Sequence, residues 1–413
     1  MITRVVISNY RSLGENVDIR LGRLTALVGP NGSGKSNVVD ALRFVADSLR
    51  KGLEFAITTR HGINAIRRWS NSGHLDTSIQ IELSEGDDVR GVYVIELSGS
   101  EDDECLVKRE YAKYSFPCDL PYFISTEEEG TEEEIWERQP VDDEFEVVGG
   151  TWKKEAKDVQ PLVDKSTLVL PLLAGSFYFE GLARRLQAMS VYSIFPEKLR
   201  KPQESDPRRP MAEDGSNWCS ILRQSKNEEW LPDLRAALGS LTGDIDDLRV
   251  SQIGGYLTAE FHHQFAPSIE QKSTDTGKWM SSSQESDGTL RMAGILTALL
   301  QEPPLTLIGI EEPELTIHPG ALRLLYDFLE EASTRSQVVI TTHSPDLLEH
   351  LNADEVRVVS RTDGVTTVSE IDETQRREVR DRLLTLGELM RIEGIRPRAN
   401  STAVAGGGDS ANG

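Results

Sequence analysis

The sequence has few cysteines, few aromatic residues and no long apolar run. Only three of its 413 residues are cysteines, Cys105, Cys118 and Cys219, and no two of them have CxxC spacing. This excludes a disulfide scaffold and favours a reducing compartment. No stretch approaches 18 uninterrupted apolar residues, and the N-terminus lacks the apolar segment of a secretory signal. We therefore expect a cytoplasmic protein without a membrane span.

Basic residues are also in deficit. The chain has 45 Lys and Arg against 68 Asp and Glu, a net charge of −23 at pH 7, so the whole chain lacks an electrostatic footprint for nucleic acid or an anionic membrane. Residues 101–146 hold 17 acidic and four basic residues, and we expect a solvated acidic loop there. Short basic clusters such as Arg60, Arg67 and Arg68 permit DNA contact but do not indicate it.

The pattern of apolar residues predicts an α/β fold with mixed and parallel sheets. Residues 1–112 are expected to form an N-terminal lobe with strands at 2–8, 17–21 and 24–28, one amphipathic helix, and an antiparallel meander. Residues 113–248 are predicted to hold the acidic segment and an inserted, mainly helical lobe. Residues 249–395 contain apolar strands at 305–310 and 337–342 around a helix, which predicts a parallel sheet. Residues 396–413 are expected to be a disordered tail.

A glycine-rich loop lies between the strand at 24–28 and the helix that follows it. Its residues match the pattern GxxxxGK[ST] and are Gly29, Pro30, Asn31, Gly32, Ser33, Gly34, Lys35 and Ser36. In such a loop the backbone N–H groups surround phosphates at a helix N-terminus, the lysine neutralises them and the serine hydroxyl binds Mg²⁺. The flanking strand and helix disfavour the alternative of a plain glycine-rich turn.

Two further strands end in polar residues. The strand at 305–310 is followed by Glu311 and Glu312, and the strand at 337–342 is followed by His343. The carboxyl ends of parallel strands are where such sheets place ligands. We expect Glu311 to hold Mg²⁺, Glu312 to orient and deprotonate the water that attacks the γ-phosphate, and His343 to reach that phosphate. Taken alone, the two acids are also consistent with the N-cap region of a helix. His343 alone is also consistent with a loop residue that makes its hydrogen bonds within the chain.

The order of these motifs resembles the ABC-type ATPases of the RecF and SMC group. The matching segments are GPNGSGKS, SSQESDGTLR, LTLIGIEEPELTIHP and VVITTHSP. More narrowly, the chain is similar to the stand-alone ATPases allied to OLD proteins and to the ATPase subunits of retron and Septu-type phage defence. The resemblance implies an ABC-type P-loop ATPase head that uses ATP and Mg²⁺.

The resemblance also assigns roles to residues outside the phosphate loop. It implies that Ser286, Asp287 and Gly288 form a signature segment that faces the ATP bound by the other subunit of a head-to-tail homodimer. His343 would sense the γ-phosphate, and Glu314 to Pro319 would connect the two sites of the dimer. An ordinary helix cap by Ser286 or Asp287 is the alternative.

The sequence departs from the family pattern in two respects, and one residue of the pattern is left unassigned. Glu311 stands where the family has Asp, so its place as a metal ligand is less secure. The chain after Pro345 is too short for the Toprim nuclease of OLD proteins, so any nuclease is expected to be another chain. The glutamine that completes such sites is not assigned; among the candidates weighed, Gln80 lies inside a strand pattern and Gln139, Gln160 and Gln187 are equally unsupported.

These features favour an ATPase whose dimer closes on two ATP molecules and relays hydrolysis to a separately encoded effector such as a nuclease, in anti-phage defence. The alternative is a RecF-like repair or loading ATPase that clamps DNA, with Arg60, Arg67 and Arg68 on its phosphates. A kinase also fits the phosphate loop, but it does not explain the signature segment or His343.

Overall fold

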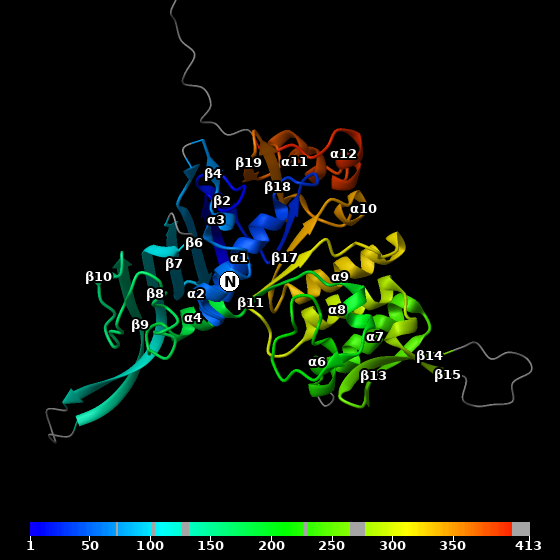
Figure 1. Cartoon of the computed structure of the whole chain (residues 1–413), viewed down its shortest axis with the longest axis horizontal. Helices are drawn as coiled ribbons and strands as arrows, with labels where there is room; N and C mark the ends of the chain where they lie inside the picture. Colours follow the sequence, from blue (N-terminus) through cyan, green and yellow to red (C-terminus); the bar gives the residue numbers. More distant parts are fainter. Residues whose placement is uncertain (72, 101–103, 126–131, 226–228, 265–276, 399–413) are drawn as a thin grey trace, which may run out of the picture.

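A six-stranded sheet lies at the centre of the computed structural model, which describes residues 1–71, 73–100, 104–125, 132–225, 229–264 and 277–398 (Figure 1). In spatial order its strands are β11 (Met189–Tyr192), β16 (Leu307–Glu311), β17 (Gln337–Thr342), β3 (Leu24–Val28), β18 (Val356–Thr362) and β19 (Val365–Ser369). The first five run parallel, and β19 pairs antiparallel with β18. The predicted parallel sheet is therefore present.

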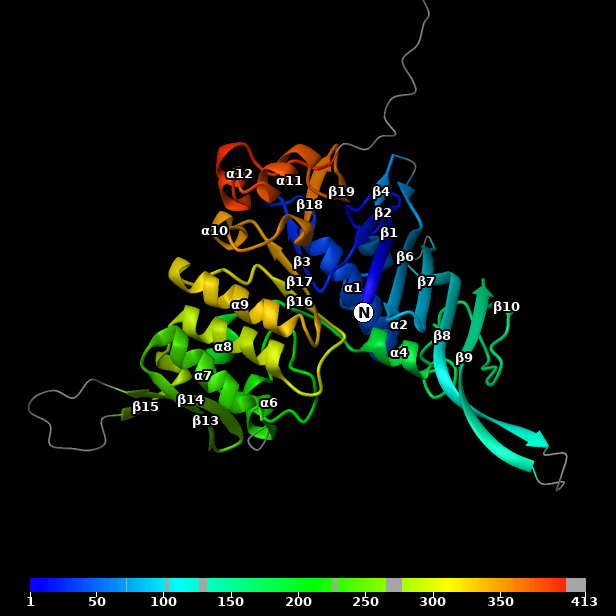
Figure 2. The same cartoon turned by 180° about the vertical axis from the view of Figure 1, so that it is seen from behind.

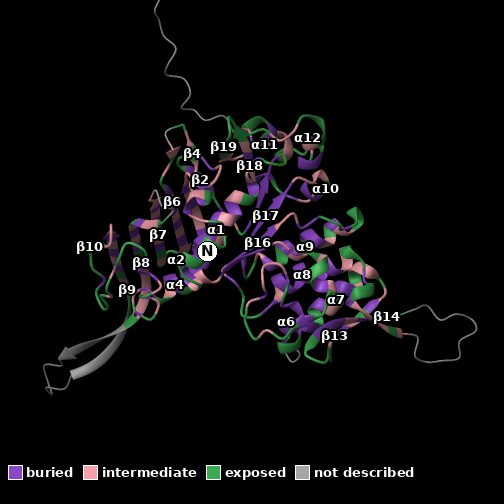
Figure 3. Cartoon of the chain, in the orientation of Figure 1, coloured by how far each residue is buried: buried purple, intermediate pink, exposed green. Residues whose placement is uncertain are grey.

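Both faces of this sheet are covered, which is why its strands read as continuous apolar runs. Every residue of β3 and β17 is buried, as the purple centre of the molecule shows (Figure 3). Alternate residues point to opposite faces. Leu27 and Val339 belong to the core that includes helix α1 (Lys35–Arg50), whereas Ala26 and Ile340 belong to the core that includes helix α8 (Asp287–Leu300).

The second sheet has seven antiparallel strands and contains the predicted meander. In spatial order they are β10 (Thr151–Lys154), β9 (Glu132–Val148), β8 (Cys105–Ser125), β7 (Val89–Gly99), β6 (Thr77–Glu85), β1 (Ile2–Ser8) and β2 (Val17–Arg20). Strand β6 alternates between buried and partly exposed residues, because one face of this sheet packs on the core and the other does not.

The acidic segment is not the loop that the composition predicts. Most of it forms β8 and β9, whose outer halves pair only with each other, from Phe116 opposite Val141 to Ser125 opposite Glu132. Figures 1 and 2 both show this two-stranded ribbon extending away from the rest of the chain. The predicted boundary at residue 113 falls inside β8, because local composition says nothing about pairing with β7.

Helices and a third sheet form a second lobe. Its helices include α5 (Pro196–Arg200), α6 (Trp218–Gln224) and α7 (Trp230–Thr242), and its strands are β12 (Gln203–Glu204), β13 (Ile245–Ile253), β14 (Tyr256–Gln264) and β15 (Gly277–Ser281). Helix α4 (Glu180–Gln187) instead packs in the same core as α1. From residue 180 to 248 helices predominate, as the sequence predicts, and the third sheet is completed by β14 and β15, which follow that range. The predicted boundary at residue 249 falls inside β13, whose residue Leu248 packs in the same core as Trp218 and α8.

The remaining elements lie around these sheets. They are α2 (Leu53–Thr58), α3 (Ile63–Ile66), β4 (Trp69–Ser70), β5 (Gly73–His74), η1 (Ser282–Gln284), η2 (Pro319–Ala321), α9 (Leu322–Ala332), α10 (Pro345–Leu348), η3 (Ala353–Glu355), α11 (Glu373–Arg380) and α12 (Leu386–Ile392). No helix of the described residues is long and apolar enough to span a membrane. Most of the predicted tail, residues 399–413, lies outside the described residues; Pro397 bridges to Ile371.

Candidate functional site

Three neighbouring parallel strands deliver the predicted site residues to one edge of the central sheet. Strand β3 leads into the phosphate loop, β16 ends in Glu311 and Glu312, and β17 is followed by His343. In register, Glu311 lies opposite Thr341, and Thr342 lies opposite Val28. The phosphate loop therefore meets the acids and the histidine, which follow it by about 300 residues in sequence, at one sheet edge.

The phosphate loop has a backbone that only glycine fits. Gly34 has φ 107°, and a Cβ there would lie 2.4 Å from Thr366 Oγ1. A Cβ on Gly29 would lie 2.2 Å from the carbonyl oxygen of Val359. Gly34 is also the N-cap of α1 and provides no side-chain cap, so the N–H groups of the first turn are left open to an anion.

The Lys35 ammonium lies over this loop. Its Nζ donates to the carbonyl oxygens of Gly29 at 2.8 Å and Pro30 at 3.2 Å, and the side chain is buried. Burial lowers the pKa of Lys35, while the charges of Glu312 and Glu314 act in the opposite direction. Carbonyl dipoles alone compensate a buried ammonium poorly, and an anionic ligand in the loop would compensate it better.

Glu312 and His343 are paired. The Nδ1 atom of His343 lies 3.0 Å from Glu312 Oε1. Glu312 has φ 44°, a strained conformation for a residue with a side chain. Two backbone bonds hold it: its amide donates to the carbonyl oxygen of Thr341 at 2.9 Å, and its carbonyl accepts from Arg291 Nη2 at 2.9 Å. These hydrogen bonds hold the Glu312 backbone in this conformation while its carboxylate contacts His343.

Glu314 and Ser33 carry orphaned polar atoms at this edge. Glu314 Oε1 accepts a hydrogen bond from Thr342 Oγ1 at 2.5 Å. The second oxygen, Oε2, is buried without a partner among the described residues, as is Ser33 Oγ. Burial raises the pKa of Glu314. Buried polar atoms are seldom left unpaired, so two unpaired oxygens at this edge of the sheet are consistent with a binding site for a polar ligand.

Glu311 and Ser36 line one cavity of about 410 Å³. Glu311 Oε2 accepts a hydrogen bond from Ser193 Oγ and lies 3.6 Å from Arg43 Nη2. A carboxylate and a hydroxyl beside open space for phosphate and water oxygens form a donor set that fits Mg²⁺. Arg43 also lies 3.2 Å from Glu213 Oε2, which ties this cavity to the second lobe.

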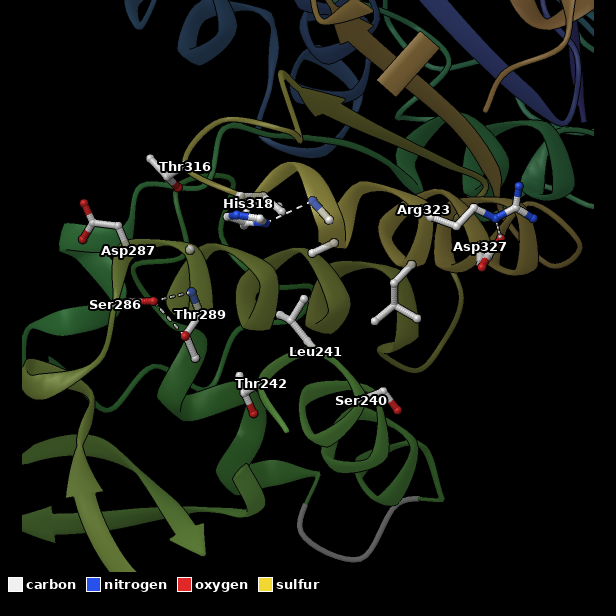
Figure 4. Close-up of a pocket in the computed structure, with 15 residues that line it drawn as sticks. Ser240, Leu241, Thr242, Ser286, Asp287, Thr289, Thr316, His318, Arg323 and Asp327 are labelled. Atoms are coloured by element: carbon white, nitrogen blue, oxygen red, sulfur yellow. Dashed lines mark hydrogen bonds and ion pairs between the residues drawn. The ribbon is translucent and has the colours of Figure 1, made fainter. Parts of the chain in front are cut away.

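The signature residues lie in a different cavity, of about 960 Å³ (Figure 4). Ser286 caps α8, its Oγ accepting from the amide of Thr289 at 3.1 Å. Asp287 accepts a hydrogen bond from Arg200, and a Cβ on Gly288 would lie 2.7 Å from the carbonyl oxygen of Thr316. This cavity shares no residue with the one beside Ser36. The helix cap weighed from the sequence is thus present, and the segment is not brought onto the phosphate loop of its own chain.

Sequence reasoning missed three side chains that contact the site. Ser193 follows β11 and reaches Glu311 across 118 positions, and Thr366 Oγ1 donates to the Ser33 carbonyl at 2.7 Å across 333 positions. Arg291, on α8, contacts the carbonyls of both Glu311 and Glu312. Arg291 is the last residue of the segment SSQESDGTLR, so the motif could have predicted that it contacts the site. A single hydroxyl such as that of Ser193 or Thr366 gives no such indication.

The arginines considered for DNA contact are engaged within the chain. Arg60 is 6% exposed and bonds to Asp40 and Asp47. The Arg67 side chain is 9% exposed and contacts Asp76 together with the carbonyl oxygen of Leu75. Arg60 and Arg67 are therefore poor candidates for phosphate contacts, because such contacts need exposed cations.

Two curated proteins match short segments of the chain. An OLD nuclease from Thermus scotoductus is 47% identical over 45 residues, which are 11% of this chain and 8% of that protein. The chromosome partition protein Smc of Desulfitobacterium hafniense is 50% identical over 42 residues, which are 10% of this chain and 4% of that protein. The matches thus span less than a tenth of either relative.

Similarity to solved structures extends over nearly the whole chain. A crystal structure of an Smc head bound to the C-winged helix domain of ScpA has a TM-score of 0.54 at 14% identity, covering 91% of this chain and 99% of that one. An Smc head with an extended coiled coil, bound to the C-terminal domain of ScpA and derived from Pyrococcus furiosus, has a TM-score of 0.54 at 12% identity, with coverage of 92% and 99%. At these identities the likeness concerns the fold.

A family model covers most of the chain. The model described as "AAA domain, putative AbiEii toxin, Type IV TA system" (AAA_21) matches residues 24–349, more than half of the sequence. The match runs from β3 through the phosphate loop to the residues after His343. The chain therefore belongs to the AAA_21 family and has the α/β fold of an SMC head.

Proposed function

We propose that this protein binds ATP with Mg²⁺ and hydrolyses it to ADP and phosphate. The observation that carries the proposal is the pairing of Glu312 with His343 at the sheet edge that also holds the phosphate loop. An acid paired with a histidine beside an open helix N-terminus can supply the base and the phosphate contacts that phosphoryl transfer to water uses.

The phosphate loop supplies binding. The amides from Asn31 to Ser36 surround the terminal phosphates, and Lys35 exchanges its carbonyl contacts for phosphate oxygens. Ser36 and Glu311 would hold Mg²⁺, which neutralises charge on the β- and γ-phosphates. Ser193 donates to Glu311 and keeps its carboxylate oriented.

Glu312 and His343 supply the chemistry. The Glu312 carboxylate accepts a proton from the attacking water, and the water oxygen forms the new bond to phosphorus as the bond to ADP breaks. His343, held by Glu312 through Nδ1, presents its other ring nitrogen to the γ-phosphate. Arg291 fixes the backbone of both acids and so limits their movement during the step.

We further propose a head-to-tail homodimer, in which the signature segment of each chain completes the site of the other. The support is geometric: Ser286, Asp287 and Gly288 line a cavity separate from the Ser36 cavity. A signature surface that does not meet its own phosphate loop needs a second chain to contribute to catalysis.

The biological role that we propose is control of a separately encoded effector, such as a nuclease, in anti-phage defence. The family description names a toxin of a toxin–antitoxin system, and one local match is an OLD nuclease. The RecF-like alternative has less support, because Arg60 and Arg67 are engaged in ion pairs within the chain.

The direct test is phosphate release by the purified chain, with Lys35→Ala as the matched variant. We expect Mg²⁺-dependent turnover in the wild type and a loss of ATP affinity of roughly 100-fold or more in Lys35→Ala, because a phosphate-neutralising charge is removed. Equal ATP affinity in both proteins would refute the assignment of the loop.

A further inference from the structure

His263 lies between two carboxylates in the second lobe. It is on β14 and is 8% exposed. Its Nδ1 atom lies 2.9 Å from Asp244 Oδ2, and its Nε2 atom lies 2.8 Å from Glu285 Oε1. Asp244 lies between α7 and β13, and Glu285 lies between η1 and α8. One ring therefore joins two segments that are far apart in sequence.

Two carboxylate partners require two N–H donors, and only the imidazolium form of histidine has both. Burial alone would lower the pKa of His263, but its hydrogen bonds and charge interactions with Asp244 and Glu285 raise it above the ordinary value. Lys278, its register partner on β15, is exposed. The neighbouring His262 contacts Asp246 instead, with its Nδ1 2.6 Å from Asp246 Oδ1.

Each of the two carboxylates adjoins a segment that lines the cavity in Figure 4. Glu285 directly precedes Ser286, which lines one wall with Asp287, Gly288 and Thr289. Asp244 follows the last turn of α7, whose residues 240–242 line a second wall. The Glu285 side chain is only 5% exposed, so it has little freedom to find another partner. The ring thus sets how the two walls lie relative to each other.

We propose that His263 is a positioning residue that holds the signature segment in place by binding Glu285 and Asp244 together. The inference rests on the proposed function, since the signature segment acts in ATP hydrolysis only there. His263 contacts neither ATP nor the reacting water. It acts through Glu285 on Ser286 and the first turn of α8.

Loss of the His263 bonds should change ATP affinity and kcat differently, whereas a general structural defect would change both. ATP affinity depends on the Lys35 loop, which is on the central sheet and shares no cavity with His263. Turnover depends in addition on the position of the signature segment. Loss of the His263 bonds should therefore lower kcat without weakening ATP binding.

The test compares His263→Gln with the matched control His262→Gln. Glutamine cannot supply two ring N–H donors, whereas the control changes the adjacent histidine, whose partner is Asp246. We expect hydrogen exchange of the amides from 285 to 290 to become roughly tenfold faster in His263→Gln, without nucleotide, and kcat to fall roughly tenfold at unchanged ATP affinity. Wild-type kcat should fall as pH rises through the His263 pKa, and this limb should be absent in His263→Gln.

Each outcome has one meaning. Unchanged exchange in His263→Gln overturns the positioning role, whatever the ATPase activity. Faster exchange in both variants overturns it as well, because the effect would not be specific to His263. Faster exchange only in His263→Gln with unchanged kcat shows that the position does not matter for turnover, which also overturns the proposal. If exchange is faster only in His263→Gln and the wild-type protein itself has no ATPase activity, the positioning role is supported and the proposed function is refuted.

Discussion

The phosphate loop and the signature segment are both helix N-termini, but they differ in what covers them. Helix α1 begins after Gly34 with no side-chain cap, whereas α8 is capped by its own Ser286. Next to α1 lie a buried ammonium, a strained acid and orphaned polar atoms. At the start of α8, Ser286 bonds to the amide of Thr289 and Asp287 contacts Arg200. The difference is that the first turn of α1 is open to an anionic ligand, whereas the first turn of α8 is already capped by a side chain of its own chain.

Arg291 connects the two regions within one chain. It lies on α8, one turn after the signature residues, and donates to the carbonyls of Glu311 and Glu312 at 3.1 Å and 2.9 Å. A movement of the signature helix would therefore reach the acids through one buried guanidinium. This contact gives a physical route by which closure of a dimer could adjust catalysis.

The largest single-residue effect on turnover should come from Glu312→Gln. The amide keeps the size of the acid but cannot accept the proton of water, so kcat should fall by roughly 10²- to 10⁴-fold while ATP still binds. The trapped ATP complex should be dimeric. Phosphate release and ATP binding are measured on the same preparation of Glu312→Gln, and we expect the release to stop while the binding is retained. If Glu311→Gln alone stopped turnover and Glu312→Gln did not, the two acids would have exchanged roles.

A smaller effect on binding should come from the support of the phosphate loop. Thr366→Val removes the hydroxyl that donates to the Ser33 carbonyl, at nearly constant volume. We expect ATP affinity to weaken roughly 3- to 10-fold, as measured by titration with labelled ATP. Thr367→Val is the matched control, since the Thr367 hydroxyl pairs with Ser360 instead. Equal losses of ATP affinity in both variants would show that Thr366 does not support the phosphate loop specifically.

The smallest effect concerns Glu314 and pH. Burial raises its folded-state pKa above the unfolded value, so the stability it contributes is present at low pH and is lost as pH rises through the folded-state pKa. Glu314→Gln removes this titration and should gain about 1 kcal/mol of unfolding free energy relative to wild type at pH 8 but not at pH 4.5. Urea unfolding at both pH values measures the difference. The same change at exposed Glu331 should leave the pH slope as it is, and an unchanged slope in Glu314→Gln would contradict the account.

The sequence predicts the elements that follow from local pattern. The strands at 2–8, 24–28 and 337–342 have the predicted bounds, because buried strands are apolar runs bounded by turn residues. The shared edge of β3, β16 and β17 follows from the parallel sheet. The β8–β9 ribbon could not be predicted in this way, because acidic residues are depleted in strands. The composition of a strand also does not indicate which strand it pairs with.

The contacts that complete the site were beyond sequence reasoning for the same reason. Ser193 and Thr366 are single hydroxyls whose partners lie 118 and 333 positions away. Arg60 looked like a surface cation but is buried against Asp40 and Asp47. A charge cluster in a sequence does not reveal whether its members face solvent or one another.

The most direct test of a site shared between chains mixes two inactive variants. Ser286→Arg should bind ATP without hydrolysing it, and Lys35→Ala should not bind it. In a mixed dimer, Lys35 of the Ser286→Arg chain and Ser286 of the Lys35→Ala chain form one intact site. An equal mixture should therefore recover roughly a quarter of the wild-type rate if sites act independently. The double variant Lys35→Ala/Ser286→Arg, added in excess to wild type, should instead suppress activity, because each mixed site then carries one defect. No recovery in the first mixture, together with undiminished wild-type activity in the second while mixed dimers form, would contradict the account.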